Sequence, residues 1–98
     1  MKLNDRSICF MAGLYGNERS PVRALGHKGL DFVLGNPKAY ERNIRFIDRD
    51  LNASFGVSDS SYESGRATEI LNEINGGDVV IDFHTTTAPG VPFAVLTE

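Results

Sequence analysis

The hexapeptide GLYGNE, residues 13–18, holds the first side chains in the sequence whose types and spacing could do chemistry. Tyr15 and Glu18 stand three residues apart among glycines that permit tight backbone geometry. Either the pair belongs to a metal or substrate site, or Glu18 only complements the dipole of a helix that starts beside it. The hexapeptide alone does not decide between these interpretations.

A second candidate side chain, His84, follows an apolar run late in the sequence. It comes directly after VVIDF, residues 79–83, and before three threonines whose hydroxyls could serve a polar pocket. A lone histidine beside an apolar run is usually a hydrogen-bonded core residue, and this alternative stays open. Asp82 either supports His84 from behind, as carboxylates do for metal-bound histidines, or faces solvent.

The elements that would position these residues alternate between strand and helix patterns. We expect strands at 7–12, 30–34, 79–83 and 92–98, helices at 17–25 and 62–74, and a short helical turn at 37–42. Such alternation predicts a three-layer α/β fold, with a mainly parallel or mixed sheet flanked by helices. Parallel strands carry their binding groups at the carboxyl ends, so GLYGNE, Asn36-Pro37 and His84 should gather along one edge.

The most regular helix pattern covers residues 62–74 and is ended by Gly76-Gly77. Its apolar stripe consists of Ala67, Ile70, Leu71 and Ile74. Four charged residues lie off the stripe, on the polar side: Glu63, Arg66, Glu69 and Glu73. Residues 44–55 show neither a strand nor a helix period, which favours an ordered loop.

Composition and charge narrow the class of protein. Ninety-eight residues make at most one small domain, near the lower limit for a self-sufficient core. A net charge of -3 without a run of Lys or Arg argues against binding to nucleic acid or to anionic membranes. No apolar run approaches the roughly 18 residues of a membrane span. The polar first residues do not form a signal peptide, and the lone Cys9 fits a buried thiol, so we expect a cytoplasmic protein.

Three motifs, in order along the chain, resemble the succinylglutamate desuccinylase and aspartoacylase family, which consists of zinc-dependent deacylases related to the metallocarboxypeptidases. The motifs are GLYGNE at 13–18, NPKA at 36–39 leading into RFIDRDLN at 45–52, and DFHTTT at 82–87. The resemblance extends over about residues 8–96. It implies a metallocarboxypeptidase-like but incomplete fold, in which residues 1–98 form the N-terminal part of a catalytic domain.

In that family a His and a Glu three residues apart, together with a later His, bind one zinc ion. The resemblance therefore implies that Glu18 and His84 are metal ligands. Tyr15 stands where the family has its first His, and a neutral phenol is a poor zinc ligand. Either Tyr15 loses its proton and binds zinc as a phenolate, or zinc is held more weakly by two ligands.

The resemblance also implies that Arg45 polarises the amide carbonyl as a catalytic group and that Asn52 binds a substrate carboxylate. From its local sequence, Arg45 could instead be a solvated charge or a partner of Asp48 or Asp50, and Asn52 a plain turn residue. Ala53 follows Asn52 where the family commonly has Arg, which removes a two-pronged carboxylate contact.

The function implied by the resemblance is zinc-assisted hydrolysis of an amide bond in a small acylated amino acid or amine. The family's general base is a Glu beyond the matched region, and Glu98 comes too early, so we expect the 98-residue chain alone to be inactive. The alternative is an inactive relative or fragment that binds a small carboxylate or a protein partner. The last strand has nothing after it to cover the sheet, so a homo-oligomer is a further hypothesis.

Overall fold

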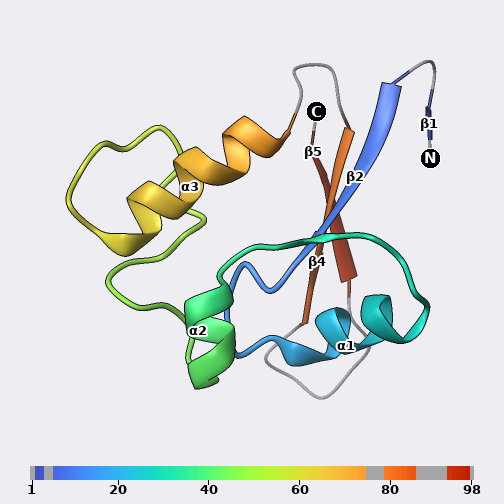
Figure 1. Cartoon of the computed structure of the whole chain (residues 1–98), viewed down its shortest axis with the longest axis horizontal. Coiled ribbons are helices and arrows are strands. Elements are labelled where there is room, and N and C mark those ends of the chain that lie inside the picture. The colour runs from blue at the N-terminus through green and yellow to red at the C-terminus, as the bar shows by residue number, and fades with distance from the viewer. Residues whose placement is uncertain (1, 4–5, 75–78, 86–92, 98) are drawn as a thin grey trace.

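The structure is a computed structural model that describes residues 2–3, 6–74, 79–85 and 93–97, and it shows a small α/β fold (Figure 1). Its elements are β1 (Lys2–Leu3), β2 (Arg6–Ala12), α1 (Arg19–His27), β3 (Val33–Leu34), α2 (Pro37–Arg42), α3 (Tyr62–Glu73), β4 (Val79–His84) and β5 (Phe93–Thr97). None of the helices in the described ranges combines the length and apolar character that a membrane crossing requires.

A mixed sheet forms the middle of the fold. β2 pairs in parallel with β3 and with β4, whereas β5 pairs antiparallel with β4. β1 pairs antiparallel with the first residues of β2. The expected mainly parallel or mixed sheet is confirmed. Because β2 and β4 run the same way with Ala12 opposite Phe83, the chain leaves both strands at the same edge of the sheet.

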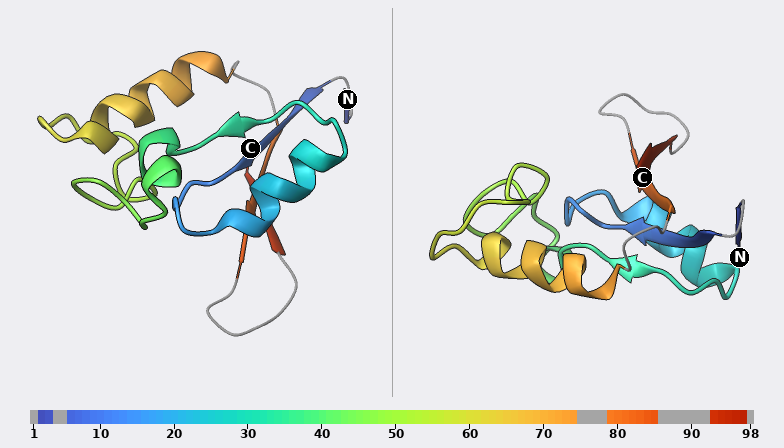
Figure 2. Two further views of the ribbon diagram at one scale, coloured as in Figure 1. Left: turned by 60° about the horizontal axis from the view of Figure 1, so that its bottom comes forward. Right: turned by 90° about the horizontal axis from the view of Figure 1, so that it is seen from above.

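Helices cover both faces of this sheet, which gives the predicted three layers. Met11 packs in one core cluster with Ala67 and Ile70 of α3. The next residue, Ala12, packs in a second cluster with residues of α1. Successive side chains of a strand point to opposite faces, so neighbouring residues of β2 contact different helices. Figure 2 shows α1, in cyan, and α3, in yellow to orange, flanking the strands.

Two elements differ from their predicted bounds by more than one residue. β3 covers Val33–Leu34 rather than 30–34, because Gly29 turns the chain with a φ of 68° and Leu30 stays exposed. α1 begins at Arg19 rather than at residue 17, and it continues through Gly26 to His27. A single glycine near the end of a helix weakens the helix without ending it.

The first turn of α3 is buried on a side that the sequence pattern did not indicate. Ala67 and Ile70 are buried as predicted, whereas Leu71, on the predicted stripe, is 54% exposed. Glu63, assigned to the polar side, is completely buried. The loop that precedes α3 covers this turn, and a helical period cannot reveal such a cover. α3 ends at Glu73, and the predicted stop Gly76-Gly77 lies outside the described residues.

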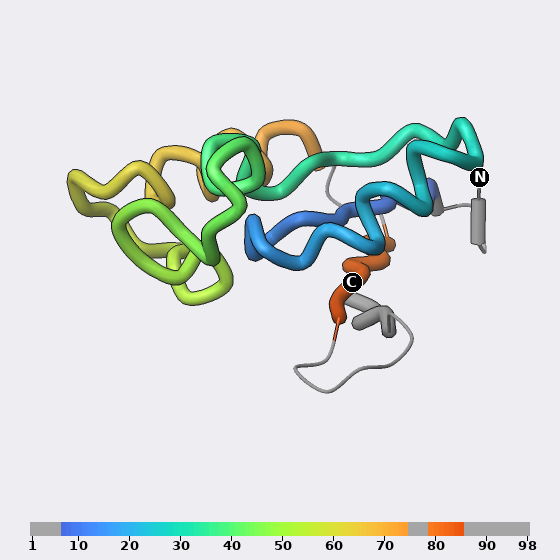
Figure 3. The backbone as a smooth tube through the Cα atoms, turned by 90° about the horizontal axis from the view of Figure 1, so that it is seen from below, coloured from blue at the N-terminus to red at the C-terminus, as the bar shows by residue number. Residues whose placement is uncertain are grey.

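α2 has the predicted bounds, with Asn36 as its cap and Pro37 at its first position. The Asn36 Oδ1 atom accepts a hydrogen bond from the Ala39 N–H at 3.2 Å, which satisfies a free amide of the first turn. Residues 44–55 form an ordered loop without regular structure, as expected. Figure 3 shows the segment between α2 and α3, green to yellow, beside α3 and away from α1.

Candidate metal and substrate site

The GLYGNE segment is the turn from β2 into α1, and it is packed against the segment that carries Arg45. A Cβ atom at Gly16 would lie 2.2 Å from the Ala39 carbonyl carbon and 2.3 Å from the Ile44 oxygen, so only glycine fits there. The Gly16 N–H donates to the Arg45 carbonyl oxygen at 3.1 Å. This contact joins the first motif to the second.

The structure brings Glu18 and His84 together at the carboxyl ends of β2 and β4. The Nδ1 atom of His84 lies 3.1 Å from Oε2 of Glu18, and their side chains are 12% and 13% exposed. Glu18 is the N-cap residue of α1, yet its side chain makes no capping hydrogen bond. The carboxylate is directed at the imidazole instead of serving the helix end.

Asp82 holds the second nitrogen of the same ring. The Nε2 atom of His84 lies 2.7 Å from Oδ2 of Asp82. The hydrogen bond to Asp82 raises the pKa of His84, burial lowers it, and the charges of Asp82 and Glu18 add to the increase. Asp82 is buried, and its Oδ1 atom has no hydrogen-bond partner within the described residues. Of the two alternatives for Asp82, the structure shows the contact with His84 and not exposure to solvent.

The Glu18 and His84 donors fit a zinc ion in chemistry and in spacing. Zinc bonds of about 2.0–2.2 Å at tetrahedral angles place two ligand atoms roughly 3.3 Å apart, and the observed separation is 3.1 Å. Asp82 binds the other ring nitrogen, so it supports His84 without facing the same ion. Across the described ranges, no group of three or more His, Cys, Asp and Glu side chains could hold a metal. Two donors fit, and the part of the chain that the structure describes supplies no third.

Tyr15 lies beside these donors, but its hydroxyl is directed elsewhere. Its ring centroid is 6.0 Å from that of His84, and its hydroxyl donates to Oδ2 of Asp50 at 3.0 Å. Burial, the hydrogen bond to Asp50 and the charge of Asp50 raise the pKa of Tyr15, against a lowering by Arg45. Because the hydroxyl faces Asp50 and not the Glu18 and His84 donors, the geometry argues against Tyr15 as a metal ligand.

Arg45 stacks on the ring of Tyr15, with its Cζ atom 3.8 Å from the ring centroid. The two acids considered as its partners are engaged elsewhere. Asp50 accepts from Tyr15, and Asp48 accepts from the Tyr62 N–H at 2.8 Å. The guanidinium is thus held by an aromatic face at the same edge as Glu18 and His84.

Asn52 is linked to this site through Asp50. The Asn52 N–H donates to Oδ1 of Asp50 at 2.9 Å, in a short turn, and Asn52 is exposed. The neighbouring Ala53 carbonyl accepts from Arg49 at 3.1 Å, and Arg49 also pairs with Asp59 at 2.6 Å. Arg49 is therefore engaged and does not supply the guanidinium that is missing at position 53.

Two buried polar residues lie behind the site: Asn36 was expected at this edge, whereas Glu63 was missed as a functional candidate. Asn36 and Glu63 are both 0% exposed, and Nδ2 of Asn36 donates to Oε2 of Glu63 at 2.8 Å. The Asn36 N–H also donates to the Gly13 oxygen at 2.8 Å, so the predicted gathering of the strand ends is present. An acid in the first turn of a helix suggests a dipole contact, and nothing local shows that Glu63 binds a distant loop.

Comparison with known proteins identifies relatives of the chain. The family model for the succinylglutamate desuccinylase/aspartoacylase catalytic domain matches residues 27–94, which include Arg45, Asn52 and His84. A probable aspartoacylase of Prochlorococcus marinus subsp. pastoris is 44% identical over 101 residues, covering 85% of this chain and 34% of the relative. An N-acyl-aromatic-L-amino acid amidohydrolase (carboxylate-forming) of Xenopus tropicalis is 35% identical over 105 residues, covering 83% and 34%.

A probable aspartoacylase of Nostoc sp. is 43% identical over 67 residues, covering 57% of this chain and 23% of the relative. No solved structure matches the chain significantly. The chain spans about a third of the length of the curated relatives first named, 34% in each case. The family model covers more than half of the chain, and it includes two of the three motifs. The chain belongs to the succinylglutamate desuccinylase/aspartoacylase family.

Proposed function

We propose that this chain forms the metal-binding part of a zinc-dependent hydrolase that cleaves the amide bond of a small N-acyl amino acid. The approach of Glu18 Oε2 to His84 Nδ1, at 3.1 Å, carries the proposal. The family is zinc-dependent. The names of two relatives, a probable aspartoacylase and an N-acyl-aromatic-L-amino acid amidohydrolase (carboxylate-forming), agree in the class of substrate.

Glu18 and His84 would hold the ion. Zinc bound there would supply a nucleophile at neutral pH, since it lowers the pKa of a water molecule in its coordination sphere to about 7. Asp82 would accept the Nε2 proton of His84, which leaves the Nδ1 lone pair facing Glu18. With zinc at Nδ1, the contact with Asp82 would hold the Nε2–H tautomer that metal binding needs.

Arg45 would bind the oxygen of the amide carbonyl. Its guanidinium lies against Tyr15 and its carbonyl is tied to Gly16, so its position relative to the Glu18 turn is fixed. A positioned cation stabilises the negative charge that develops on this oxygen when the carbonyl is attacked. Loss of one such donor typically lowers the rate by about 10²–10³-fold.

Asn52 would bind the substrate carboxylate through its side-chain amide. An amide donor holds a carboxylate less firmly than an arginine fork does. Because position 53 is Ala and Arg49 is engaged by Asp59, a substrate with a second carboxylate would be bound weakly. We therefore propose that this site accepts N-acyl amino acids with one carboxylate at least as well as dicarboxylates.

One observation favours a second function, the binding of a small carboxylate without catalysis. The Tyr15 hydroxyl donates to Asp50 and is not directed at the Glu18 and His84 donors. A site with two metal donors from this chain binds zinc more weakly than one with three. Arg45 and Asn52 would then bind an anion at this edge without the help of a metal ion.

Zinc titration by calorimetry tests the metal proposal. We expect stoichiometric binding that is lost in Glu18→Ala and in His84→Ala but retained in Glu41→Ala, which changes an exposed acid of α2. Wild-type protein that binds no zinc above background contradicts the proposal. Binding of N-acetyl-L-phenylalanine and N-acetyl-L-aspartate, measured with and without zinc, then separates a metal-dependent substrate site from a carboxylate site that needs no metal.

A further inference from the structure

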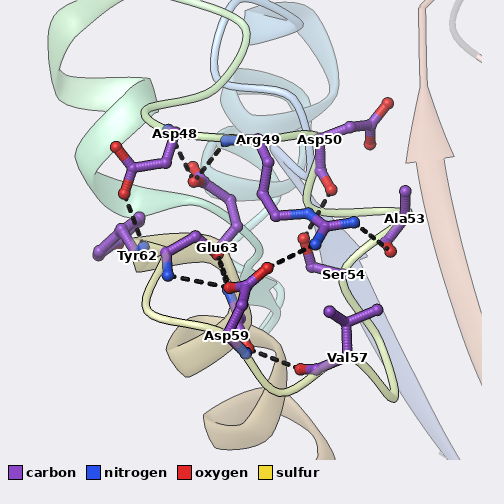
Figure 4. Close-up of polar contacts among 11 residues, drawn as sticks. Asp48, Arg49, Asp50, Ala53, Ser54, Val57, Asp59, Tyr62 and Glu63 are labelled. Atoms are coloured by element: carbon purple, nitrogen blue, oxygen red, sulfur yellow. Dashed lines mark hydrogen bonds and ion pairs between the residues drawn. The ribbon is translucent and has the colours of Figure 1, made fainter.

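A completely buried carboxylate lies behind the segment that carries Arg45. Glu63 belongs to the first turn of α3 and is 0% exposed. Figure 4 shows its carboxylate pointing into the loop at residues 48–49. A charge in such a position must be satisfied by hydrogen bonds, because leaving it without partners is strongly unfavourable.

The two oxygens of Glu63 accept four hydrogen bonds, all from uncharged donors. Oε1 accepts from the N–H groups of Asp48 at 2.8 Å and Arg49 at 3.1 Å. Oε2 accepts from the Ile47 N–H and from Nδ2 of Asn36, each at 2.8 Å. Three consecutive backbone N–H groups directed at one anion form a nest, which is an arrangement that binds anions in proteins. Here the anion is a side chain of the same protein.

An uncharged, apolar residue at position 63 could also pack the first turn of α3 against the loop. Replacing a buried charged group and its partners by apolar groups of similar volume is often neutral or stabilising. A nest that closes on Glu63 does something that an apolar residue could not do, because it fixes the backbone direction at three successive residues. Its effect is therefore on the conformation of residues 47–49.

Residues 47–49 lie between Arg45 and Asp50, whose side chains both contact Tyr15. Arg45 stacks on the Tyr15 ring at 3.8 Å, and Asp50 accepts the Tyr15 hydroxyl at 3.0 Å. On the other side, the Arg45 carbonyl accepts the Gly16 N–H. Residues 45–50 are therefore held by Glu63 on one side and by Tyr15 and Gly16 on the other.

A second contact between α3 and this segment runs in the opposite direction. Oδ2 of Asp48 accepts from the N–H of Tyr62, the first residue of α3, at 2.8 Å, as Figure 4 shows. The carboxylate of α3 therefore binds amides of the loop, and a carboxylate of the loop binds an amide of α3. Two reciprocal contacts define both the distance and the orientation of the loop on the helix.

We infer that Glu63 is a positioning residue for Arg45: its buried carboxylate holds residues 47–49 so that the guanidinium stays stacked on Tyr15, at the edge where Glu18 and His84 meet. The use of Arg45 toward a substrate rests on the proposed function. The placement of Arg45 by Glu63 can be measured without any substrate.

Glu63→Gln tests the inference, with Glu69→Gln as the matched control on the exposed side of α3. Glutamine keeps the size of the side chain but directs an NH₂ group at donors that need an acceptor. We expect the ring-current shift of the Arg45 side-chain protons, caused by Tyr15, to collapse in the NMR spectrum. Amide exchange at residues 47–49 should accelerate on the order of tenfold or more. Zinc affinity should stay within about twofold, since Glu18 and His84 lie on other elements.

Glu63→Asp is measured as a second variant. It keeps the negative charge, so it provides a folded protein for the test if Glu63→Gln does not fold. Withdrawing the carboxylate by one methylene should reduce the Arg45 shift partway. A wild-type Arg45 shift in either folded variant overturns the inference, as does a loss of zinc binding in parallel with the Arg45 signal, which would indicate general unfolding. Wild-type protein that shows the shifted Arg45 signal but neither binds nor hydrolyses N-acetyl-L-aspartate or N-acetyl-L-phenylalanine contradicts the proposed function and not this inference.

Discussion

The Nδ1 atom of His84 lies 3.1 Å from Oε2 of Glu18, although 66 positions separate the two residues in the chain. Their approach follows from the parallel pairing of β2 with β4. Ala12 lies opposite Phe83, so the turn that contains Glu18 and the residue after Phe83 emerge at one edge of the sheet. Tyr15 stands where the family has its first His ligand, and its hydroxyl binds Asp50 instead of facing these two donors.

Tyr15→His should raise zinc affinity on the order of tenfold or more, since each added ligand contributes to a metal-binding free energy of several kcal/mol. Tyr15→Phe should leave zinc affinity unchanged, because the hydroxyl donates to Asp50 and does not face the donor pair. Both affinities can be measured by competition with a chelating dye. Loss of zinc in Tyr15→Phe would instead identify the phenolate as a ligand.

Asp82→Asn should weaken zinc binding by about 10–100-fold, the usual effect of removing a charged partner behind a metal-bound histidine. The amide keeps the shape of Asp82 but lacks the charge that orients and polarises His84. Asp31→Asn, at an exposed position, is the control. Equal zinc affinities in the two variants would rule out the supporting role of Asp82.

Ile70→Ala should lower the free energy of unfolding by about 2–5 kcal/mol, as expected for a large side chain removed from a core. Ile70 is 0% exposed, whereas its neighbour Leu71 is 54% exposed. Leu71→Ala should therefore change stability by only about 0.5 kcal/mol. Urea denaturation of the two variants measures the difference, and similar losses would show that Leu71 is covered in the native protein.

Gly16→Ala should destabilise the protein by about 1–3 kcal/mol or more, as overpacking does in a tight core. The new methyl group would meet the backbone of Ala39 and Ile44, which cannot rotate away. Gly26→Ala should stabilise α1 by about 0.5–1 kcal/mol, because nothing lies within 4 Å of its Cβ position and Ala favours helix. Thermal unfolding of the pair tests this contrast, and a tolerated Gly16→Ala would contradict the packing of the turn.

Glu63 should make stability depend on pH. Burial by itself would raise its pKa, but hydrogen bonds from Ile47, Asp48, Asn36 and Arg49 outweigh burial and hold the pKa below the ordinary 4.5. A pKa lowered by folding stabilises the protein above the unfolded pKa, and this contribution is lost as the pH falls through the folded value.

The stability difference between the wild type and Glu63→Gln should therefore be largest near about pH 7 and should shrink below about pH 4. Urea denaturation across this range, with Glu69→Gln as the reference, provides the measurement. A difference that is independent of pH would show that the carboxylate of Glu63 is not ionised in the folded protein.

The order of the elements from β2 to β5, the bounds of α2 and the family of the chain could be predicted from the sequence, whereas β1 was not. Apolar periods, the Asn36-Pro37 start of α2 and the three motifs are local patterns, and local chemistry is enough to read them. The proximity of Glu18 and His84 was predictable as well, because parallel strands bring their carboxyl ends to one edge.

Only the tertiary structure decided how Tyr15 and Glu63 are used. The hydroxyl of Tyr15 binds an acid 35 positions away, and the carboxylate of Glu63 binds amides 14 to 16 positions away. The helical pattern assigned Glu63 to the polar side of α3, yet a loop without any periodic signal covers it. Contacts of this kind depend on which irregular segment packs on which helix, and no pattern within either segment encodes the pairing.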